Sequence, residues 1–274
     1  MTADDFGVSP EVNEAVIRAH RDGPLRFASL MVAEPAASQA VERARREAPG
    51  LGLGLHAVLC AGRSVSASPE LIGSNGEFPA DPVFCGLRYF FDRSLLVPME
   101  RELRGQFERF FTFGLRPSHV DGHVNIHAHP VVFPLLARLS REYGFRRIRL
   151  PGGEFGISML FSSRPLLKQL IEASVFGLLR RYLLRAYADP RLETPDRVLG
   201  LLRSGLMKEE YVVHCLRSLP PGLSEIYLHP SSEGGSEAGD RPTPTHRSIT
   251  ELRTLLSERV RDAIANGIEL VYGG

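Results

Sequence analysis

Short apolar segments alternate with amphipathic segments along most of the chain. Apolar runs of strand length predict strands at residues 25–33, 51–59, 118–130, 147–150, 224–229 and 269–272. Apolar residues at helical spacing predict helices at residues 10–22, 35–47, 98–113, 131–143, 208–219 and 249–266. This alternation is typical of an α/β fold built on parallel strands.

The length and composition favour one large domain over residues 1–274. Of the residues, 43% are hydrophobic and 24% charged, and no linker divides the chain. Two stretches are long for connections between strands and helices and are interpreted as insertions: residues 63–93, rich in Pro, Gly and aromatic residues, and residues 160–188.

Charge and cysteine content exclude several classes of protein. A formal net charge of +1 predicts no nucleic-acid partner. Cys60, Cys85 and Cys215 are widely spaced and form no metal-ligand pattern, so we expect buried thiols in a reducing compartment. Without a signal peptide or an apolar run of about 20 residues, the sequence predicts a cytoplasmic protein, at most peripheral at the inner face of a membrane.

Paired carboxylates stand at the beginning of the chain. Asp4 and Asp5 precede Phe6 and Gly7. Because consecutive side chains at a strand end point to opposite sides, one acid could bind a metal while its neighbour reaches a water. A surface turn rich in Asp and Gly would explain the same pair.

Histidines occur in two of the predicted strands. His56 lies towards the far end of the apolar run 52–59, where a satisfied core histidine is the alternative to a ligand. In residues 118–130 a period of two places Asp121, His123, Asn125 and His127 on one face. This density of imidazoles favours a metal or catalytic site over a solvated polar face.

A further histidine follows a third strand. His229 comes directly after Leu228 and before Pro230, which stops the strand. An imidazole at the carboxyl end of a strand lies where α/β barrels and open α/β sheets carry their chemistry, although it could also merely cap a loop.

In their order and spacing these motifs resemble the YdjC-like carbohydrate deacetylases. The resemblance covers nearly the whole chain and rests on four separated motifs: Thr2 to Gly7, Gly54-Leu55-His56, Asp121-Gly122-His123 with His127, and Leu228-His229-Pro230. Residues 29–32, 86–91 and 148–151 look more narrowly like HpnK, the branch associated with hopanoid biosynthesis.

The resemblance implies a (β/α) barrel-like fold and metal-dependent removal of an acetyl group from an N-acetylated sugar. By motif position, Asp5, His56 and His123 match the family's metal ligands, Asp4 its catalytic base and His229 its catalytic acid. The residues themselves agree, because one carboxylate and two imidazoles leave room for water and a carbonyl oxygen. Protonation of the departing amine then requires an acid such as His229.

Three further residues are expected to act around these. His127 and Asp121 would orient a ligand or the substrate. Arg149 could orient Asp4 or contact the substrate, and a salt bridge, with Glu154 as the nearest acid in sequence, is the alternative. The family often carries histidines where this chain has Val124 and Asn125, a departure that concerns the surroundings of the metal.

We expect one divalent metal ion as cofactor, magnesium or zinc. Mixed oxygen and nitrogen ligands suit zinc, manganese, cobalt or ferrous iron more naturally than magnesium. The partner would be a small glycan or glycolipid, and for an HpnK-like enzyme an N-acetylglucosaminyl hopanoid.

The two insertions have separate expected roles. Residues 63–93 follow His56 and could cover the sugar or form a packed surface loop. Residues 160–188 form an amphipathic, basic helical stretch, for which packing on the barrel is favoured over lying on an anionic bilayer.

Two other functions compete with deacetylation. A glycosidase could use Asp4 with Asp121 or Glu154, although it would leave the histidines idle. An impaired family member could instead bind a membrane or partner through residues 160–188.

The impaired alternative depends on the beginning of the chain. Only Met1, Thr2 and Ala3 precede the paired acids, so the first strand is expected to be missing, through a start site chosen too far downstream or a true loss. Asp4 and Asp5 would then lie on a fraying terminus, with weak metal binding and poor stability.

Overall fold

The structure is a computed structural model that describes residues 1–161, 167–187, 189–233 and 247–271. Its centre is a parallel sheet with the strand order β4-β3-β2-β1-β6-β5. The strands are β1 (Thr2–Phe6), β2 (Phe27–Leu30), β3 (Gly52–Ala57), β4 (Val120–Gly122), β5 (Arg197–Leu199) and β6 (Ser224–Leu228).

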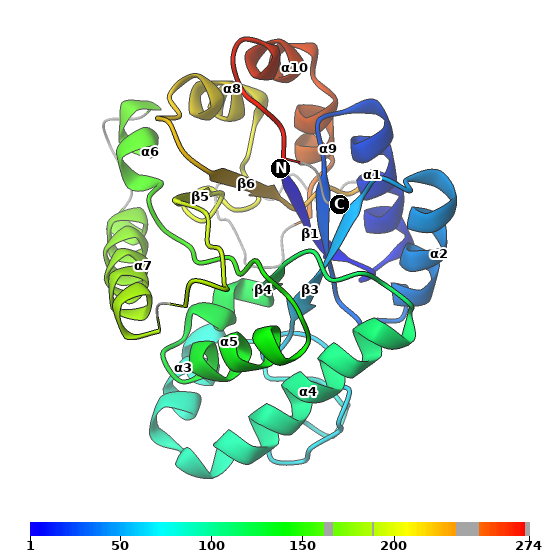
Figure 1. Cartoon of the computed structure of the whole chain (residues 1–274), viewed down its shortest axis with the longest axis vertical. Coiled ribbons are helices and arrows are strands. Elements are labelled where there is room, and N and C mark those ends of the chain that lie inside the picture. Colours follow the sequence, from blue (N-terminus) through cyan, green and yellow to red (C-terminus); the bar gives the residue numbers. More distant parts are fainter. Residues whose placement is uncertain (162–166, 188, 234–246, 272–274) are drawn as a thin grey trace.

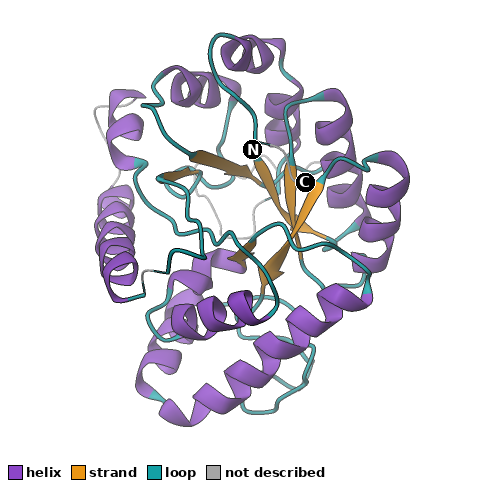
Figure 2. Ribbon diagram, viewed as in Figure 1, coloured by secondary structure: helices purple, strands orange, loops and turns teal. Residues whose placement is uncertain are grey.

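Helices surround this sheet on the outside, as Figures 1 and 2 show. They are α1 (Pro10–Asp22), α2 (Ala37–Glu47), α3 (Pro82–Phe91), α4 (Leu96–Thr112), α5 (Val132–Glu142), α6 (Phe155–Phe161), α7 (Leu167–Ala186), α8 (Glu209–Arg217), α9 (Ile249–Leu256) and α10 (Glu258–Ala265), with short 3-10 helices η1 (Arg93–Leu95) and η2 (His123–Ala128). The parallel sheet inside a ring of helices confirms the predicted α/β barrel-like class.

The expectation of a missing first strand is wrong. Residues Thr2–Phe6 form β1, which lies between β2 and β6 and is buried throughout. Thr2 pairs with Phe27 on one side and with Tyr227 on the other, and the Met1 carbonyl accepts hydrogen bonds from the next strand. Five residues suffice because both edges of the strand are paired, so the acids do not lie on a fraying end.

The sheet curls into a half-barrel, and an extended segment crosses its open side. Ile148 bridges Val120 of β4, whereas Gly152 bridges Val198 of β5. The predicted strand at 147–150 is therefore present only as isolated bridges. It contributes to closing the curled sheet between its two edge strands.

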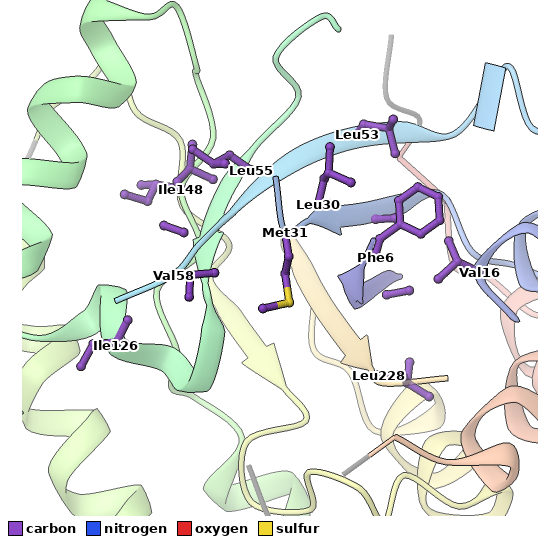
Figure 3. Close-up of a cluster of buried hydrophobic side chains, with 14 of the residues drawn as sticks. Phe6, Val16, Leu30, Met31, Leu53, Leu55, Val58, Ile126, Ile148 and Leu228 are labelled. Atoms are coloured by element: carbon purple, nitrogen blue, oxygen red, sulfur yellow. The ribbon is translucent and has the colours of Figure 1, made fainter. Parts of the chain in front are cut away.

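The core lies between the sheet and the helices that cover it. Figure 3 shows Phe6 of β1 and Leu30 of β2 near Val16 of α1, whereas Leu55 of β3 lies beside Ile148. Ser9 caps α1 by accepting a hydrogen bond from the Val12 amide, as its position before Pro10 predicts. The capping residue lies three residues after β1 ends, so α1 follows β1 directly.

Several predicted boundaries differ from the structure. The helix expected at 249–266 is broken at Ser257, whose hydroxyl caps α10. Residues 269–271 of the described part form no strand, and Tyr272 lies outside it. Strand β5 was not predicted. Helix α3, which lies inside the insertion 63–93, was not predicted either. The three cysteines are buried and free, as expected.

The insertion 160–188 contains the end of α6 and the long helix α7, with residues 162–166 and 188 outside the described part. Only Leu183 of α7 is fully buried among its described side chains, so the favoured packing on the barrel is limited. Among the described helices, none is sufficiently long and apolar to cross a membrane.

Candidate active site

The predicted site residues meet at the edge of the sheet where the parallel strands end. They are supplied by four strands and the residues that follow them: Asp4 and Asp5, His56, Asp121 with His123, and His229. All of these side chains are buried. The fold therefore brings together segments that lie far apart in the sequence.

Asp5, His56 and His123 form the predicted metal-ligand cluster. The Nδ1 atom of His123 lies 2.8 Å and the Nε2 atom of His56 3.4 Å from Oδ1 of Asp5. One ligand atom from each residue lies within 4.8 Å of the others. One carboxylate and two imidazoles are the protein ligands of an open, catalytic metal site.

Buried ligand atoms that make no hydrogen bond suggest that this cluster fits a cation. Within the described residues, neither carboxylate oxygen of Asp5 nor Nε2 of His123 makes a hydrogen bond, although the Asp5 oxygens lie in ion-pair distance of His123 and Arg247. Burial alone would raise the pKa of Asp5, but the neighbouring His123 ring holds it well below its usual range. A buried, ionised carboxylate facing two imidazoles is what a divalent ion requires.

A second grouping of acids and histidine is less open. Asp4, His56 and Asp121 also approach within ligand distance. However, both oxygens of Asp4 accept hydrogen bonds from Arg149, and both oxygens of Asp121 are similarly engaged. The cluster containing Asp5 is therefore the better metal site.

The backbone at Asp5 departs from a regular strand. Asp5 has φ 63°, in the left-handed region, and the pairing of β1 with β2 shifts between Ala3 and Phe6. An Asp tolerates this conformation better than most residues do. The irregularity changes the simple alternation of side chains, and both adjacent carboxylates are buried at the site.

Asp121 orients His56 from behind. Its Oδ1 lies 2.6 Å from Nδ1 of His56, and its Oδ2 accepts a 2.6 Å hydrogen bond from Ser29, which also contacts His119. Burial lowers the pKa of His56, but Asp121 outweighs it and raises the pKa to about 10. The bond to Nδ1 leaves Nε2 of His56 directed at Asp5, as in other carboxylate–histidine–metal arrangements.

Arg149 holds Asp4 in place. Its guanidinium donates two hydrogen bonds to the Asp4 carboxylate, at 2.6 and 2.8 Å, and lies 2.8 Å from both Asp121 and Glu225. Its Cζ atom is 4.5 Å from the centre of the Tyr227 ring. Arg149 therefore orients Asp4, and Glu154 is not its partner.

Glu154 belongs to another buried network. Its carboxylate accepts hydrogen bonds from the Tyr211 hydroxyl and the Leu202 amide. Burial raises the pKa of Glu154 despite these bonds. These contacts give Glu154 a structural role beside the half-barrel.

His229 lies across from Asp4. Its Nε2 is 4.0 Å from Oδ2 of Asp4, and its Nδ1 is 3.9 Å from Oε2 of Glu251. The same Glu251 oxygen accepts a 2.6 Å hydrogen bond from the His229 backbone amide. Glu251 therefore fixes the residue from the side opposite Asp4.

The strand predicted for residues 118–130, with side chains alternating between two faces, is present only as far as Gly122. The chain leaves β4 there and turns through η2, where Val124 and Asn125 have positive φ values of 47° and 57°. Asn125 consequently points its amide at the Tyr227 hydroxyl, 3.3 Å away. A period of two therefore does not describe the second half of this segment.

His127 is buried beside the turn with its Nδ1 3.3 Å from the Gly122 carbonyl. Within the described residues its Nε2 has no hydrogen-bond partner. Burial lowers the pKa of His127 to about 4. The structure places this ring next to the site without making it one of the three clustered ligands.

The neutral ring of His127 predicts a loss of stability in acid. Its folded pKa lies below the unfolded value of about 6.5, so protons favour the unfolded chain as the pH falls from about 6.5 towards 4. The free energy of unfolding should therefore fall in this pH range, and we expect the fall to be smaller in His127→Gln than in the wild type, by on the order of a few kcal/mol. Urea unfolding between these pH values measures it.

The matched control is His214→Gln on α8, outside the site. Equal pH dependence in the wild type and His127→Gln would contradict the neutral state of the buried ring.

A cavity of about 1150 Å³ opens onto the site. Asp4 and His229 line it, together with Asn125 and Tyr227. Residues of α3 and α7 line it as well: Pro82, Val83, Gly86, Lys168, Gln169, Glu172, Val175, Phe176 and Leu179. Both predicted insertions therefore contribute walls to the cavity.

Another cavity, of about 720 Å³, lies beside Met1, Thr2 and Glu225. Its lining includes neither Asp4 nor His229. The cavity that reaches Asp4 and His229 is therefore the one relevant to their chemistry.

Sequence reasoning missed three charged residues that complete the site. Glu225 contacts Arg149, Glu251 contacts His229, and Nε of Arg247 lies 3.1 Å from Oδ2 of Asp5. Glu225 lies within a recognised strand, where alternation could have placed it on the face opposite Ile226. Arg247 and Glu251 follow a polar segment that carries no comparable pattern.

Fold and site together define an α/β half-barrel with a candidate metal centre at the carboxyl edge of its sheet. The sequence matches the family described as YdjC-like protein over residues 1–266. The chain belongs to this family.

Carbohydrate deacetylases are among its relatives. The chain is 42% identical over 144 residues to a carbohydrate deacetylase of Geobacillus stearothermophilus, covering 52% of this chain and 56% of that protein. A carbohydrate deacetylase of Vibrio cholerae serotype O1 (strain M66-2) is 34% identical over 206 residues, covering 70% and 79%. The match to the Geobacillus stearothermophilus protein thus spans little more than half of that protein's length.

A crystal structure supports the fold alone. A putative cellobiose-phosphate cleavage protein from Enterococcus faecalis V583 superimposes with a TM-score of 0.70 at 23% identity, covering 96% of this chain and 92% of the other.

Proposed function

We propose that the protein is a metal-dependent hydrolase that removes the acetyl group from an N-acetylated sugar of the N-acetylglucosamine type. The observation that carries this proposal is the cluster of Asp5, His56 and His123 beside Asp4 and His229. The similarity to carbohydrate deacetylases supports the same reaction. Asp5, His56 and His123 would hold the cation, with zinc and magnesium as the candidates.

Each residue has a task that its surroundings support. A bound divalent cation would polarise the amide carbonyl and lower the pKa of water. Asp4, oriented by Arg149, accepts the proton of the attacking water. His229, held by Glu251 on the other side, donates a proton to the departing amine, which is otherwise a poor leaving group.

The wider cavity is consistent with a sugar that carries an apolar group. Its lining includes the apolar residues Val83, Val124, Val175, Phe176 and Leu179, together with polar and charged residues such as Lys168, Glu172 and Arg203. We therefore propose an N-acetylglucosaminyl hopanoid as the substrate, in hopanoid biosynthesis. Such a substrate would also give the stretch 160–188 a membrane to contact.

The glycosidase alternative has less support from the geometry. Asp4 is bound bidentately by Arg149, Asp121 bonds His56 and Ser29, and Glu154 bonds Tyr211. Neither Asp121 nor Glu154 lines the cavity that Asp4 lines, so neither pair of carboxyl groups faces one substrate in this cavity. The impaired alternative gained weight from the expected loss of the first strand, and that strand is present.

Asp4→Asn tests the proposed reaction. Asparagine keeps the shape but cannot accept the proton of the water, so we expect kcat for acetate release to fall by about 100- to 10,000-fold. Metal affinity should stay within about threefold of the wild type, because Asp4 is not one of the three proposed ligands. Acetate release from N-acetylglucosamine conjugates is measured after chelation and after restoring each metal.

Glu233→Gln provides a control at an exposed acid. Release of a reducing sugar instead of acetate would establish the glycosidase alternative. Full activity of the metal-free protein would contradict the proposed metal dependence.

A further inference from the structure

Helix α3 turns an apolar face towards solvent. Cys85 and Tyr89 are buried beneath it, while Phe84 is 51%, Leu87 56% and Phe91 76% exposed. These outward residues recur at the spacing of one helical face. A face of this kind is costly in water and usually marks a site of contact.

Helix α7 repeats this arrangement. Ile171 is 55% and Leu178 67% exposed, and Leu167, Val175 and Tyr182 continue the same outward face. The helix is therefore apolar on its solvent side as well as towards the cavity. Burial of Leu183 alone leaves this outer face without cover from the described residues.

The two exposed faces belong to one region of the molecule. Helices α3 and α7 both contact η2, and residues of both line the cavity that ends at Asp4 and His229. In Figure 1 they lie along the same side of the half-barrel. We call the outward faces of these two helices the apolar rim.

The charge of the apolar rim is positive. Helix α7 carries Lys168, Arg180, Arg181 and Arg185 against one acidic residue, Glu172. Arg180 is directed inward and donates to backbone carbonyls, whereas Arg181 and Arg185 are exposed. Exposed apolar side chains flanked by arginines are typical of helices that lie in the interface of an anionic bilayer.

We propose that the apolar rim docks on an anionic lipid bilayer, with the mouth of the active-site cavity close to the lipid surface. The positive charge favours this occupant over a neutral apolar partner. Apolar residues on both helices would enter the interface, while Arg181 and Arg185 would contact the headgroups. Docking itself is independent of the reaction, but its consequence for a lipid-linked substrate rests on the proposed function.

Co-sedimentation with vesicles tests the docking. The full chain is mixed with phosphatidylcholine vesicles that contain or lack phosphatidylglycerol. We expect binding to the anionic vesicles, and Arg181→Glu with Arg185→Glu should weaken it by at least about tenfold. Phe84→Ser with Phe91→Ser should weaken it similarly through loss of apolar contact.

The matched charge control is Arg217→Glu with Arg253→Glu, exposed positions on α8 and α9. It should bind within about twofold of the wild type. Because all six positions are exposed, each variant should keep the wild-type melting temperature within a few degrees, measured by circular dichroism.

Three outcomes would overturn the proposal. The first is that the wild type does not bind anionic vesicles, and the second is that the charge control loses as much vesicle binding as the Arg181→Glu, Arg185→Glu variant. The third is that the wild type is a dimer and the Phe84→Ser, Phe91→Ser variant a monomer, which would make a second copy of the chain the occupant. Acetate release from a water-soluble N-acetylglucosamine conjugate is measured in parallel. If the protein binds vesicles but releases no acetate, the proposed reaction is refuted and the proposed docking is not.

Discussion

Replacing Asp5 by asparagine should abolish both metal binding and deacetylation. The carboxylate is the sole anion in the proposed ligand set and faces His56 and His123 at 3.4 and 2.8 Å. We expect metal affinity to fall by more than about a hundredfold, since changes merely behind a ligand already cost about 10- to 100-fold. Competition with a chromogenic chelator measures this affinity without requiring activity.

A second measurement separates lost binding from lost folding. Metal at about 100 times its Kd should stabilise the wild type by about 2.7 kcal/mol, and this gain should disappear in Asp5→Asn. Asparagine tolerates the left-handed backbone at this position, so the variant should still fold. Asp262→Asn, at an acid on α10, is the matched control.

An unchanged metal-dependent rise in stability in Asp5→Asn would show that the cation binds elsewhere. The second grouping, Asp4, His56 and Asp121, would then be the next site to test.

The carboxyl edge of the sheet was the most predictable part of the site. His56 and His229 each stand at or just beyond the end of an apolar run, and parallel strands bring such ends together. The local pattern therefore contained most of the information needed to group the proposed ligands with the acid.

The turn after Gly122 was not predictable from alternation. Polar residues at every second position also occur in this 3-10 turn, where Val124 and Asn125 adopt positive φ. Such a backbone is rare for a β-branched residue, so residue preferences argued against it. Tertiary contacts, such as that of Asn125 with Tyr227, accompany this conformation.

The first strand was misjudged for a related reason. An apolar run before Asp4 was expected to anchor the pair, but β1 is held by pairing on both sides and includes the acids themselves. Strand formation here depends on β2 and β6, which lie far away in the sequence. Arg247 and Glu251 were missed because only the fold brings them to Asp5 and His229.

Replacing Arg149 by methionine should cause the largest loss of stability. Arg149 is 2% exposed and contacts the buried carboxylates of Asp4, Asp121 and Glu225. Methionine fills part of the space but leaves three acids without their shared cation. Breaking a buried ion pair costs about 3–5 kcal/mol, so we expect at least that loss in urea unfolding of the metal-free protein.

The pH dependence of this loss distinguishes charge from packing. Burial raises the pKa of Glu225 and Asp121, but Arg149 leads the groups that hold both values below their usual range. Their contribution is present above the unfolded values of about 4 and is lost as the pH falls through the folded values. Without Arg149, burial should raise both pKa values. As the pH falls, the two carboxylates are then protonated at a higher pH in the variant than in the wild type, and protonation removes their uncompensated charge.

The gap in unfolding free energy between the wild type and Arg149→Met should therefore narrow as the pH is lowered from about 7 to 5. Arg149→Lys, which keeps the charge but not the planar fork, should lose less stability and show a weaker pH dependence of the gap. Glu225→Gln in the methionine variant should restore part of the loss, because it removes one of the uncompensated charges. A gap of constant size from pH 7 to 5 would mean that Arg149 stabilises the fold through packing alone.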